Sequence, residues 1–271
     1  MRILIIGDVV GSAGRAVLNA NLSSLKIRLK TDFVIVNGEN AAHGFGITGS
    51  ICDSFYQAGV DCITTGNHVF DQRDVLSQME RDERILRPLN YVPGTPGKGS
   101  GIYKTESGKR ILVANVMCRL FMELLDDPFR AMDDLLARYK IGRDVDAIVF
   151  DVHGEATSEK QALAHHVDGR ASVVVGTHTH VPTADTWVLP GGTAYQTDLG
   201  MTGDYNSVIG MKKEGAIARF VTKGERVRLE PADKDGTLCG CFVVIDDKTG
   251  RAKRIEPVRV GASLSETIPK P

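Results

Sequence analysis

Residues 171–180 read ASVVVGTHTH, an apolar run that ends in a glycine and two histidines. The run ASVVV has the length and the β-branched content of a buried strand. Four more apolar runs precede it: RILIIGD (2–8), DFVIVNGEN (32–40), DCITTGNH (61–68) and DAIVFDVHGE (146–155). Parallel strands give such continuous runs because helices cover both faces of their sheet. The stretch therefore predicts a parallel strand whose carboxyl end carries His178 and His180.

Amphipathic segments with helical spacing separate most of these runs. They are AGRAVLNANLSSLKIRLK (13–30), SICDSFYQAG (50–59), QRDVLSQMERDE (72–83) and SEKQALAHHV (158–167). Alternation of strand and helix favours right-handed βαβ units, and hence an α/β fold with parallel sheets.

The remaining segments have other patterns. Residues 101–116 indicate a hairpin turned at ESGK, and residues 120–140 are helical, with Pro128 starting a second helix. After Trp187 we expect antiparallel strands only, including GAIARFVTK (215–223) and RVRLEP (226–231). We expect one domain over residues 1–271, in which two sheets pack together with helices outside.

Composition excludes several classes of protein. A hydrophobic content of 42% and a charged content of 25% are ordinary for a globular chain. The net charge of −1 predicts no nucleic-acid surface. No run approaches the roughly 20 apolar residues of a membrane helix, so no membrane partner is expected. Five scattered cysteines without a CxxC pair fit a reducing compartment, and we expect a cytoplasmic protein.

Potential ligand residues follow five of the predicted strands. They are Asp8, Glu39, Asn40, Asn67, His68, His153, His178 and His180. In parallel α/β sheets, ligands bind at the carboxyl ends of the strands, so one edge of the sheet is expected to gather all eight residues. In extended backbone, side chains two positions apart point the same way, whereas neighbours diverge. His178 and His180 are thus expected to share a site, while one of Asn67 and His68 binds metal and the other faces substrate.

Carboxylates, amides and imidazoles without a thiolate suit iron, manganese or zinc. Eight residues are too many for one tetrahedral zinc, but they suit two metals that share a carboxylate. Single residues also have simpler explanations. Asp8 could cap the following helix, Asn40 could shape a turn, and His153 could be a hydrogen-bonded core histidine.

The ordered set GD (7–8), GEN (38–40), GNH (66–68), His153 and GTHTH (176–180) resembles the calcineurin-like metallophosphoesterases. Two departures stand out: Val10 replaces a histidine ligand, and the bridging carboxylate is Glu39 rather than an aspartate. The YmdB-like branch of that superfamily accounts for both. The chain is similar to it in GEN, HGFGIT, GNHVFD, EATSEK and GTHTHVPTAD…GGTAYQTDLGMTG.

The resemblance implies a four-layer αββα sandwich of two mixed sheets flanked by helices, holding two metal ions, iron (Fe²⁺/Fe³⁺) or Mn²⁺. It implies Asp8, Glu39, Asn40 and His180 as ligands of one ion, and Asn40 would replace the missing histidine. Glu39, Asn67, His153 and His178 would then hold the other ion.

The resemblance also implies a phosphodiesterase that acts on small diesters such as 2′,3′-cyclic nucleotides, and 3′,5′-cyclic nucleotides as a further substrate. A hydroxide bridging the metals would attack phosphorus, and His68 would protonate the leaving alkoxide. Two alternatives remain open: a regulatory metal or nucleotide sensor, and a phosphomonoesterase. The role of His43 and the glycine-rich loop 43–49, the physiological substrate, the metal identity and a homo-oligomeric assembly also remain open.

Overall fold

The computed structural model describes residues 1–222 and 227–271. The helices are α1 (Gly11–Leu29), α2 (Gly49–Ala58), α3 (Val75–Arg81), α4 (Pro128–Arg138), α5 (Thr157–His166) and α6 (Lys213–Val221). The strands up to β6 are β1 (Arg2–Ile6), β2 (Phe33–Asn37), β3 (Cys62–Thr64), β4 (Ile85–Leu86), β5 (Ser100–Lys104) and β6 (Arg110–Met117). The later strands are β7 (Ala147–His153), β8 (Val173–Thr177), β9 (Trp187–Val188), β10 (Ala194–Gln196), β11 (Thr237–Ile245) and β12 (Ala252–Gly261).

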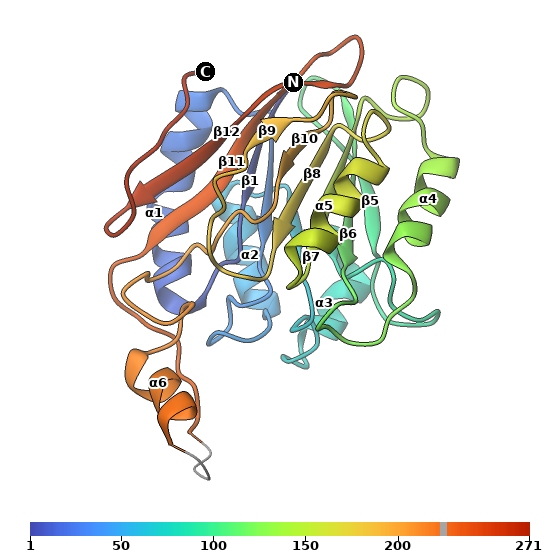
Figure 1. The fold of residues 1–271 in the computed structure, drawn as a ribbon. Helices are drawn as coiled ribbons and strands as arrows, with labels where there is room; N and C mark the ends of the chain where they lie inside the picture. Colours follow the sequence, from blue (N-terminus) through green and yellow to red (C-terminus); the bar gives the residue numbers. More distant parts are fainter. Residues whose placement is uncertain (223–226) are drawn as a thin grey trace.

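Over these described ranges the strands form two six-stranded sheets. Their orders are β12-β11-β1-β2-β3-β4 and β5-β6-β7-β8-β10-β9. Each sheet mixes parallel and antiparallel pairs: β1 is parallel to β2 and antiparallel to β11. The chain therefore returns at its end to extend the sheet with which it began (Figure 1).

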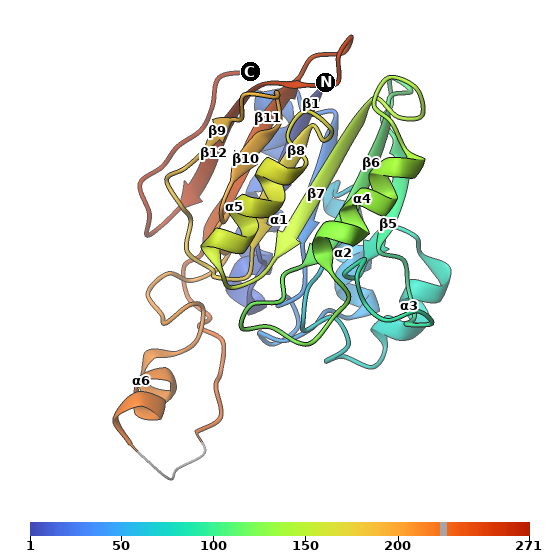
Figure 2. The same cartoon turned by 45° about the vertical axis from the view of Figure 1, so that its right-hand side comes forward.

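Alternation along the strands builds a sandwich of four layers. In β1, Leu4 packs in a cluster with Leu18 and Leu22 of α1, whereas Ile3 packs in the layer shared with Ile111 of the second sheet. The outer face of the second sheet packs against α4 and α5 in a third cluster. Figures 1 and 2 show α1 and α2 on one side of the paired sheets and α4 and α5 on the other. Both faces of each sheet are thus covered, which explains the continuous apolar runs.

The predicted α/β sandwich of two sheets flanked by helices is confirmed. The helices predicted around residues 13–30, 50–59, 72–83 and 158–167 correspond to α1, α2, α3 and α5. The predicted hairpin is β5 and β6, paired antiparallel. The short strand β4 was not predicted, because two residues give no periodic pattern.

Residues 120–127 are not helical, so the helix predicted over 120–140 is wrong in its first part. Asp127 is extended, with ψ of 117°, and its side chain accepts a hydrogen bond from the backbone N–H of Phe129. Pro128 then occupies the first turn of α4. Proline disfavours helical backbone at the residue before it, so the helix begins at Pro128, as predicted for the second helix.

Helices do not vanish after Trp187. Residues 215–221, expected to be a strand, belong to α6. Ile217, Phe220 and Val221 have helical i, i+3, i+4 spacing, which outweighs the β-branched content of the stretch. The predicted strand 226–231 is also wrong where described, since residues 227–230 are outside any strand. Lys223 and Arg226, at the ends of these two predicted strands, lie outside the described residues.

α6 stands on an arm that projects from the sandwich (Figure 2). Ile217, Phe220 and Val221 on this helix are 50–87% exposed. The base of the arm, by contrast, returns to the sandwich, where Met211 is 6% exposed. None of the helices described in residues 1–222 and 227–271 is long and apolar enough to cross a membrane.

Candidate metal centre

The predicted ligand residues meet where strand ends of both sheets converge. β1, β2 and β3 belong to one sheet, and β7 and β8 belong to the other. The expectation that one sheet edge gathers all of them is therefore wrong: two facing sheets contribute. The ligands lie at the open end of the apolar layer between the sheets, where each strand ends and a loop begins.

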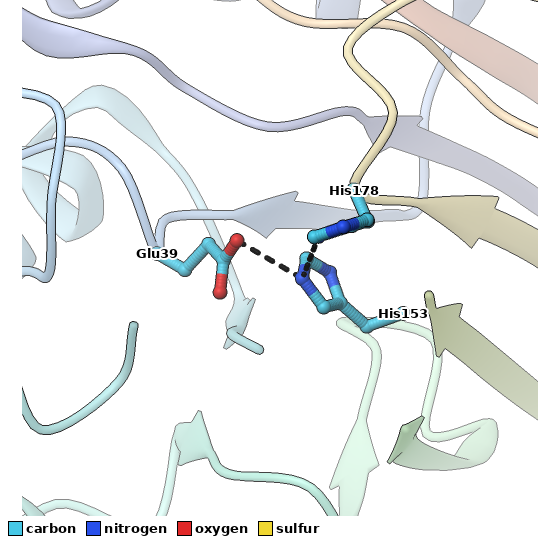
Figure 3. A group of neighbouring side chains, drawn as sticks. All are labelled: Glu39, His153 and His178. Carbon is cyan, nitrogen blue, oxygen red and sulfur yellow. Dashed lines mark hydrogen bonds and ion pairs between the residues drawn. The ribbon is translucent and has the colours of Figure 1, made fainter. Parts of the chain in front are cut away.

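Three ligand atoms cluster around the ring of His153, which ends β7. Its Nε2 atom lies 3.0 Å from Glu39 Oε1, 3.0 Å from Asn67 Oδ1 and 3.1 Å from His178 Nδ1. Figure 3 shows Glu39 and His178 directed at the His153 ring from different loops. Among the described residues, Glu39, His153 and His178 form a group with one ligand atom each within 4.8 Å of one another.

These spacings suit a shared cation. Two donors that each lie about 2.1 Å from an ion at a right angle are about 3.0 Å apart. Gly66 keeps the space open, because a Cβ there would lie 2.3 Å from both Glu39 Oε2 and His153 Nε2. The donor set of one carboxylate, one amide and two imidazoles therefore fits a borderline transition metal.

The remaining predicted ligands are Asp8, Asn40 and His180. Asp8 and Asn40 are 0% and 3% exposed, yet in the described chain neither Asp8 Oδ1 nor Asn40 Oδ1 has a hydrogen-bond partner. The Asn40 amide donates from Nδ2 to the Gly44 carbonyl at 3.0 Å, which holds the amide in one orientation. Buried oxygens without a partner are costly, so this pair fits a cation.

The alternative explanations for these residues meet specific observations. Val10, not Asp8, is the N-cap residue of α1, so Asp8 does not cap that helix. Val10 is 1% exposed and lies in apolar contact with Gly210, so it offers no ligand atom. Asn40 does brace a turn through its nitrogen, but its oxygen stays free for another role.

The GTHTH loop places its histidines through left-handed backbone rather than through an extended strand. β8 ends at Thr177, and His178 and His180 have φ of 100° and 64°. Both histidines line one cavity, although their backbone differs from the extended strand that the sequence predicts. His180 donates from Nδ1 to the Ile209 carbonyl at 2.8 Å, which leaves Nε2 free.

A buried ion pair braces this loop from beneath. Lys160 of α5 and Asp198 are 1% and 0% exposed, and their Nζ and Oδ2 atoms lie 2.8 Å apart. Lys160 also donates to the Thr177 carbonyl at 2.7 Å, and Asp198 accepts from the Thr179 N–H at 3.0 Å. The segments EATSEK and TAYQTDLG therefore hold the GTHTH loop in place.

His68 diverges from Asn67 as predicted, although residues 67–70 form a turn and not an extended segment. Its Nδ1 lies 2.8 Å from Asp71 Oδ2, and its ring makes an edge contact with Phe45 at 5.0 Å. The backbone N–H of His68 donates to Glu39 Oε2 at 3.2 Å. Asp71 thus orients the imidazole through Nδ1, and Nε2 takes no part in that contact.

Sequence reasoning missed several supporting residues. Asp71 lies in the GNHVFD stretch, three residues after His68, a spacing that could have revealed it. Glu155 Oε2 lies 3.3 Å from His178 Nε2, which leaves His178 Nδ1 for the cluster. Tyr195 is 2% exposed and packs in the core under α5, so it is not available to stack on a base.

Electrostatics favour binding of cations at both groups. Burial raises the pKa of Asp8 to about 6, although the charge of His180 opposes the shift. Burial also disfavours ionised Glu39, but the charge and hydrogen bond of His153 outweigh it and lower the Glu39 pKa to about 2. Burial and the charge of His153 lower the pKa of His178 to about 3. Glu39 is thus ionised and His178 neutral near pH 7, the forms that bind metals.

A cavity of about 290 Å³ opens over these groups. Its lining consists of Glu39, Asn40, Phe45, His68, Glu155, His178, Thr179, His180, Ile209, Met211 and Leu229. Four of the predicted metal ligands, Glu39, Asn40, His178 and His180, line it, and Ile209, Met211 and Leu229 at the base of the arm give it an apolar wall. His43 lies outside this lining, in a neighbouring cavity of about 980 Å³ that shares Phe45 and Leu229 with it.

Comparison with known proteins identifies the family. The family described as YmdB-like protein matches residues 4–258. The chain belongs to the YmdB-like family. The match spans both sheets and every predicted ligand, which confirms the resemblance found in the motifs.

Two relatives cover nearly all of the YmdB-like chain. It is 47% identical over 260 residues to the 2′,3′-cyclic-nucleotide 2′-phosphodiesterase of Bacillus subtilis, covering 96% of this chain and 97% of the relative. A crystal structure of a novel phosphatase from Mycoplasma pneumoniae is 34% identical, with a TM-score of 0.89 and coverage of 96% and 93%.

A more distant structure supports the fold. The calcineurin-like phosphoesterase YfkN of B. subtilis has a TM-score of 0.54 at 12% identity, covering 96% of this YmdB-like chain and 90% of that chain. The calcineurin-like architecture is thereby confirmed.

Proposed function

We propose that this YmdB-like protein is a dinuclear-metal phosphodiesterase that hydrolyses small cyclic diesters, above all 2′,3′-cyclic nucleotides. The supporting observation is that two sets of donor atoms lie at converging strand ends, beside one cavity. One is the cluster around His153 Nε2, and the other holds the partnerless Asp8 and Asn40 oxygens. The activity named for the B. subtilis relative supports the same substrate class.

In this proposal, Asp8, Glu39, Asn40 and His180 hold one ion, and Glu39, Asn67, His153 and His178 hold the other. Glu39 is the shared carboxylate. Both ions are iron or manganese, in keeping with a donor set of oxygen and nitrogen atoms without a thiolate. Two divalent ions and two carboxylates leave the centre with a net charge of about +2, which attracts a phosphate despite the neutral chain.

When bound, two divalent ions supply a nucleophilic hydroxide and neutralise the phosphate charge. The chain's own residues then position and protonate. His68, oriented by Asp71, gives its Nε2 proton to the departing alkoxide. Phe45 packs on the His68 ring and narrows the cavity above it. A cavity of about 290 Å³ lies at the lower end of ligand-site volumes, roughly 300–1,000 Å³, which favours a small substrate over a polymer.

We also propose that residues 1–271 act as one domain in the cytoplasm. The two sheets share one apolar layer, and a centre built from both of them cannot be divided between separate domains. The five cysteines are free and buried, as a reducing compartment permits.

The test begins with metal-free protein reconstituted with Mn²⁺ or Fe²⁺ and analysed for bound metal. We expect about two ions per chain and turnover of 2′,3′-cyclic AMP, with 3′,5′-cyclic AMP and p-nitrophenyl phosphate as comparison substrates. His153→Gln, which removes a proposed ligand, serves as the control for contaminating phosphodiesterases and is expected to be inactive.

Three outcomes contradict the proposal. A single ion per chain with no further uptake excludes the dinuclear site. Two ions without turnover of any ester support the regulatory sensor. A preference for the monoester supports the phosphomonoesterase.

A further inference from the structure

A polar network lies directly beneath the His153 cluster, inside the sandwich. In β2, β3, β7 and β8, the residues that face the layer between the sheets are apolar until close to the carboxyl end of each strand. There they become Asn37, Thr64, Asp151 and Thr177, each at most 1% exposed. Polar groups at this depth are costly unless they are hydrogen-bonded, so the network has to be nearly self-sufficient.

Asp151 lies at the centre of this network and only accepts hydrogen bonds. Its Oδ2 accepts from the Thr64 hydroxyl and from Asn37 Nδ2 at 3.1 Å, and its Oδ1 accepts from the Thr177 hydroxyl at 2.7 Å. The Asn37 amide is oriented by the backbone N–H of Glu39, which donates to Asn37 Oδ1 at 3.2 Å. Burial raises the pKa of Asp151, and the hydroxyl donors of Thr64 and Thr177 oppose that shift.

Thr177 links this carboxylate to His153. A threonine hydroxyl has a single hydrogen, and the Thr177 hydrogen goes to Asp151 Oδ1. Thr177 Oγ1 is also 2.9 Å from His153 Nδ1, so in this contact the oxygen accepts and the imidazole donates. His153 therefore carries a hydrogen on Nδ1, and Nε2, which lies 3.0 Å from Glu39 Oε1, is the ring atom directed at the ligand cluster.

We propose that Asp151 and Thr177 are positioning residues that fix the tautomer and ring orientation of His153 for metal binding. The inference rests on the proposed function, because it assigns Nε2 of His153 to an ion. Groups that hydrogen-bond the second nitrogen of a ligating histidine typically change metal affinity about 10–100-fold. Asp151 lies two residues before His153 on the same strand, deeper in the sandwich than the His153 ring. The Thr177 hydroxyl therefore connects the carboxylate to the ring.

The matched substitutions act on one hydroxyl. Thr177→Val keeps the side-chain shape and removes this connection, whereas Thr177→Ser keeps it. Thr193→Val is the control: Thr193 is 0% exposed and its hydroxyl donates to the Ala171 carbonyl at 2.7 Å, at the opposite end of β8 from the cluster. Asp151→Asn tests the carboxylate at the other end of the connection.

The first readout is the tautomer of His153 in metal-free protein, measured by long-range ¹H–¹⁵N correlation of its ring and assigned with His153→Gln. We expect hydrogen on Nδ1 in the unmodified protein and in Thr177→Ser. We expect a mixture of tautomers in Thr177→Val and Asp151→Asn. Absence of hydrogen from Nδ1 in the unmodified protein would overturn the inference, because the contact with Thr177 would then run in the opposite direction.

The second readout is the affinity for Mn²⁺, measured by chelator competition. Thr177→Val and Asp151→Asn are expected to weaken the ion at His153 about 10–100-fold. Thr177→Ser and Thr193→Val are expected to retain the unmodified affinity. In a double-mutant cycle the losses at Thr177 and Asp151 are expected to be non-additive, because both residues act through one chain of hydrogen bonds.

Thermal unfolding of the metal-free variants separates positioning from general support. A lower midpoint for Thr177→Val with unchanged Mn²⁺ affinity and an unchanged tautomer would make the residue merely structural and overturn the inference. If the unmodified protein binds no Mn²⁺ or Fe²⁺, the proposed function fails instead. The tautomer measurement still decides whether Thr177 and Asp151 orient His153.

Discussion

Removal of the buried ammonium group of Lys160, beneath the GTHTH loop, tests the structure. Lys160→Met keeps most of the apolar stem of the side chain but leaves Asp198 as a buried charge. Breaking such a pair costs about 3–5 kcal/mol. Asp198 keeps the N–H groups of Thr179 and Gly200 as donors, at 3.0 and 2.8 Å. We therefore expect a loss near 3 kcal/mol, at the lower end of that range.

The measurement is urea unfolding of metal-free protein, followed by fluorescence. Trp187, the single tryptophan, is a suitable reporter because its ring lies 6.3 Å from that of His165 on α5, the helix that carries Lys160. At about 2–4 °C per kcal/mol, the expected loss lowers the thermal midpoint by roughly 6–12 °C.

Lys253→Met is the matched control. Lys253 pairs with Asp246 at the same distance of 2.8 Å, but its side chain is 62% exposed. Exposed pairs contribute little, so this variant is expected to unfold like the unmodified protein. A loss below about 1 kcal/mol in Lys160→Met would refute the reasoning, because it would mean that Asp198 is not left uncompensated.

Three further predictions concern the centre itself. Asn40→Ala is expected to lower metal content and turnover while Val10→Ala keeps both; equal metal content in the two variants, measured by elemental analysis, would reject Asn40 as a ligand. His68→Ala is expected to keep the metals and lose about 10²–10⁴-fold in turnover of a poor leaving group, with a smaller loss for a nitrophenyl ester. Asp71→Asn should show the same dependence on the leaving group, more weakly; equal losses for both esters would argue against proton donation. Gly66→Ala is expected to abolish metal binding in a folded protein, as checked by elemental analysis and circular dichroism, because its Cβ would lie 2.3 Å from two clustered ligand atoms; normal metal content would mean that the cluster is arranged differently.

The sequence predicts the α/β half of the fold well because each element there has a clear local sequence pattern. Continuous apolar strands, amphipathic helices and glycines at the turns all point to the same answer. α6 was missed because its apolar residues are exposed on an arm, so β-branched content was read as a strand. The helix predicted over residues 120–127 is wrong for a different reason. The apolar residues there have helical spacing, but Asp127 is extended and α4 begins only at Pro128.

At the centre, the residue types were predictable, but the way in which they are held was not. Strand-end position and motif order were enough to bring Asp8, Glu39 and the histidines onto one list. Nothing local shows that two sheets supply them, or that His178 and His180 adopt left-handed backbone. Asp151 was read as part of an apolar strand, although a carboxylate two positions before His153 necessarily faces the same layer.

The pairing of β1 with β11 has a consequence for how the protein is made. β1 leaves the ribosome well before its antiparallel partner β11, which begins only at Thr237. At roughly 5–20 residues per second, the intervening stretch of about 230 residues takes on the order of 10–50 s to synthesise. For that time one side of β1, beside the strand end that carries Asp8, lacks its native neighbour. A nascent chain stalled before Thr237 would carry an open apolar strand edge, a template for aggregation.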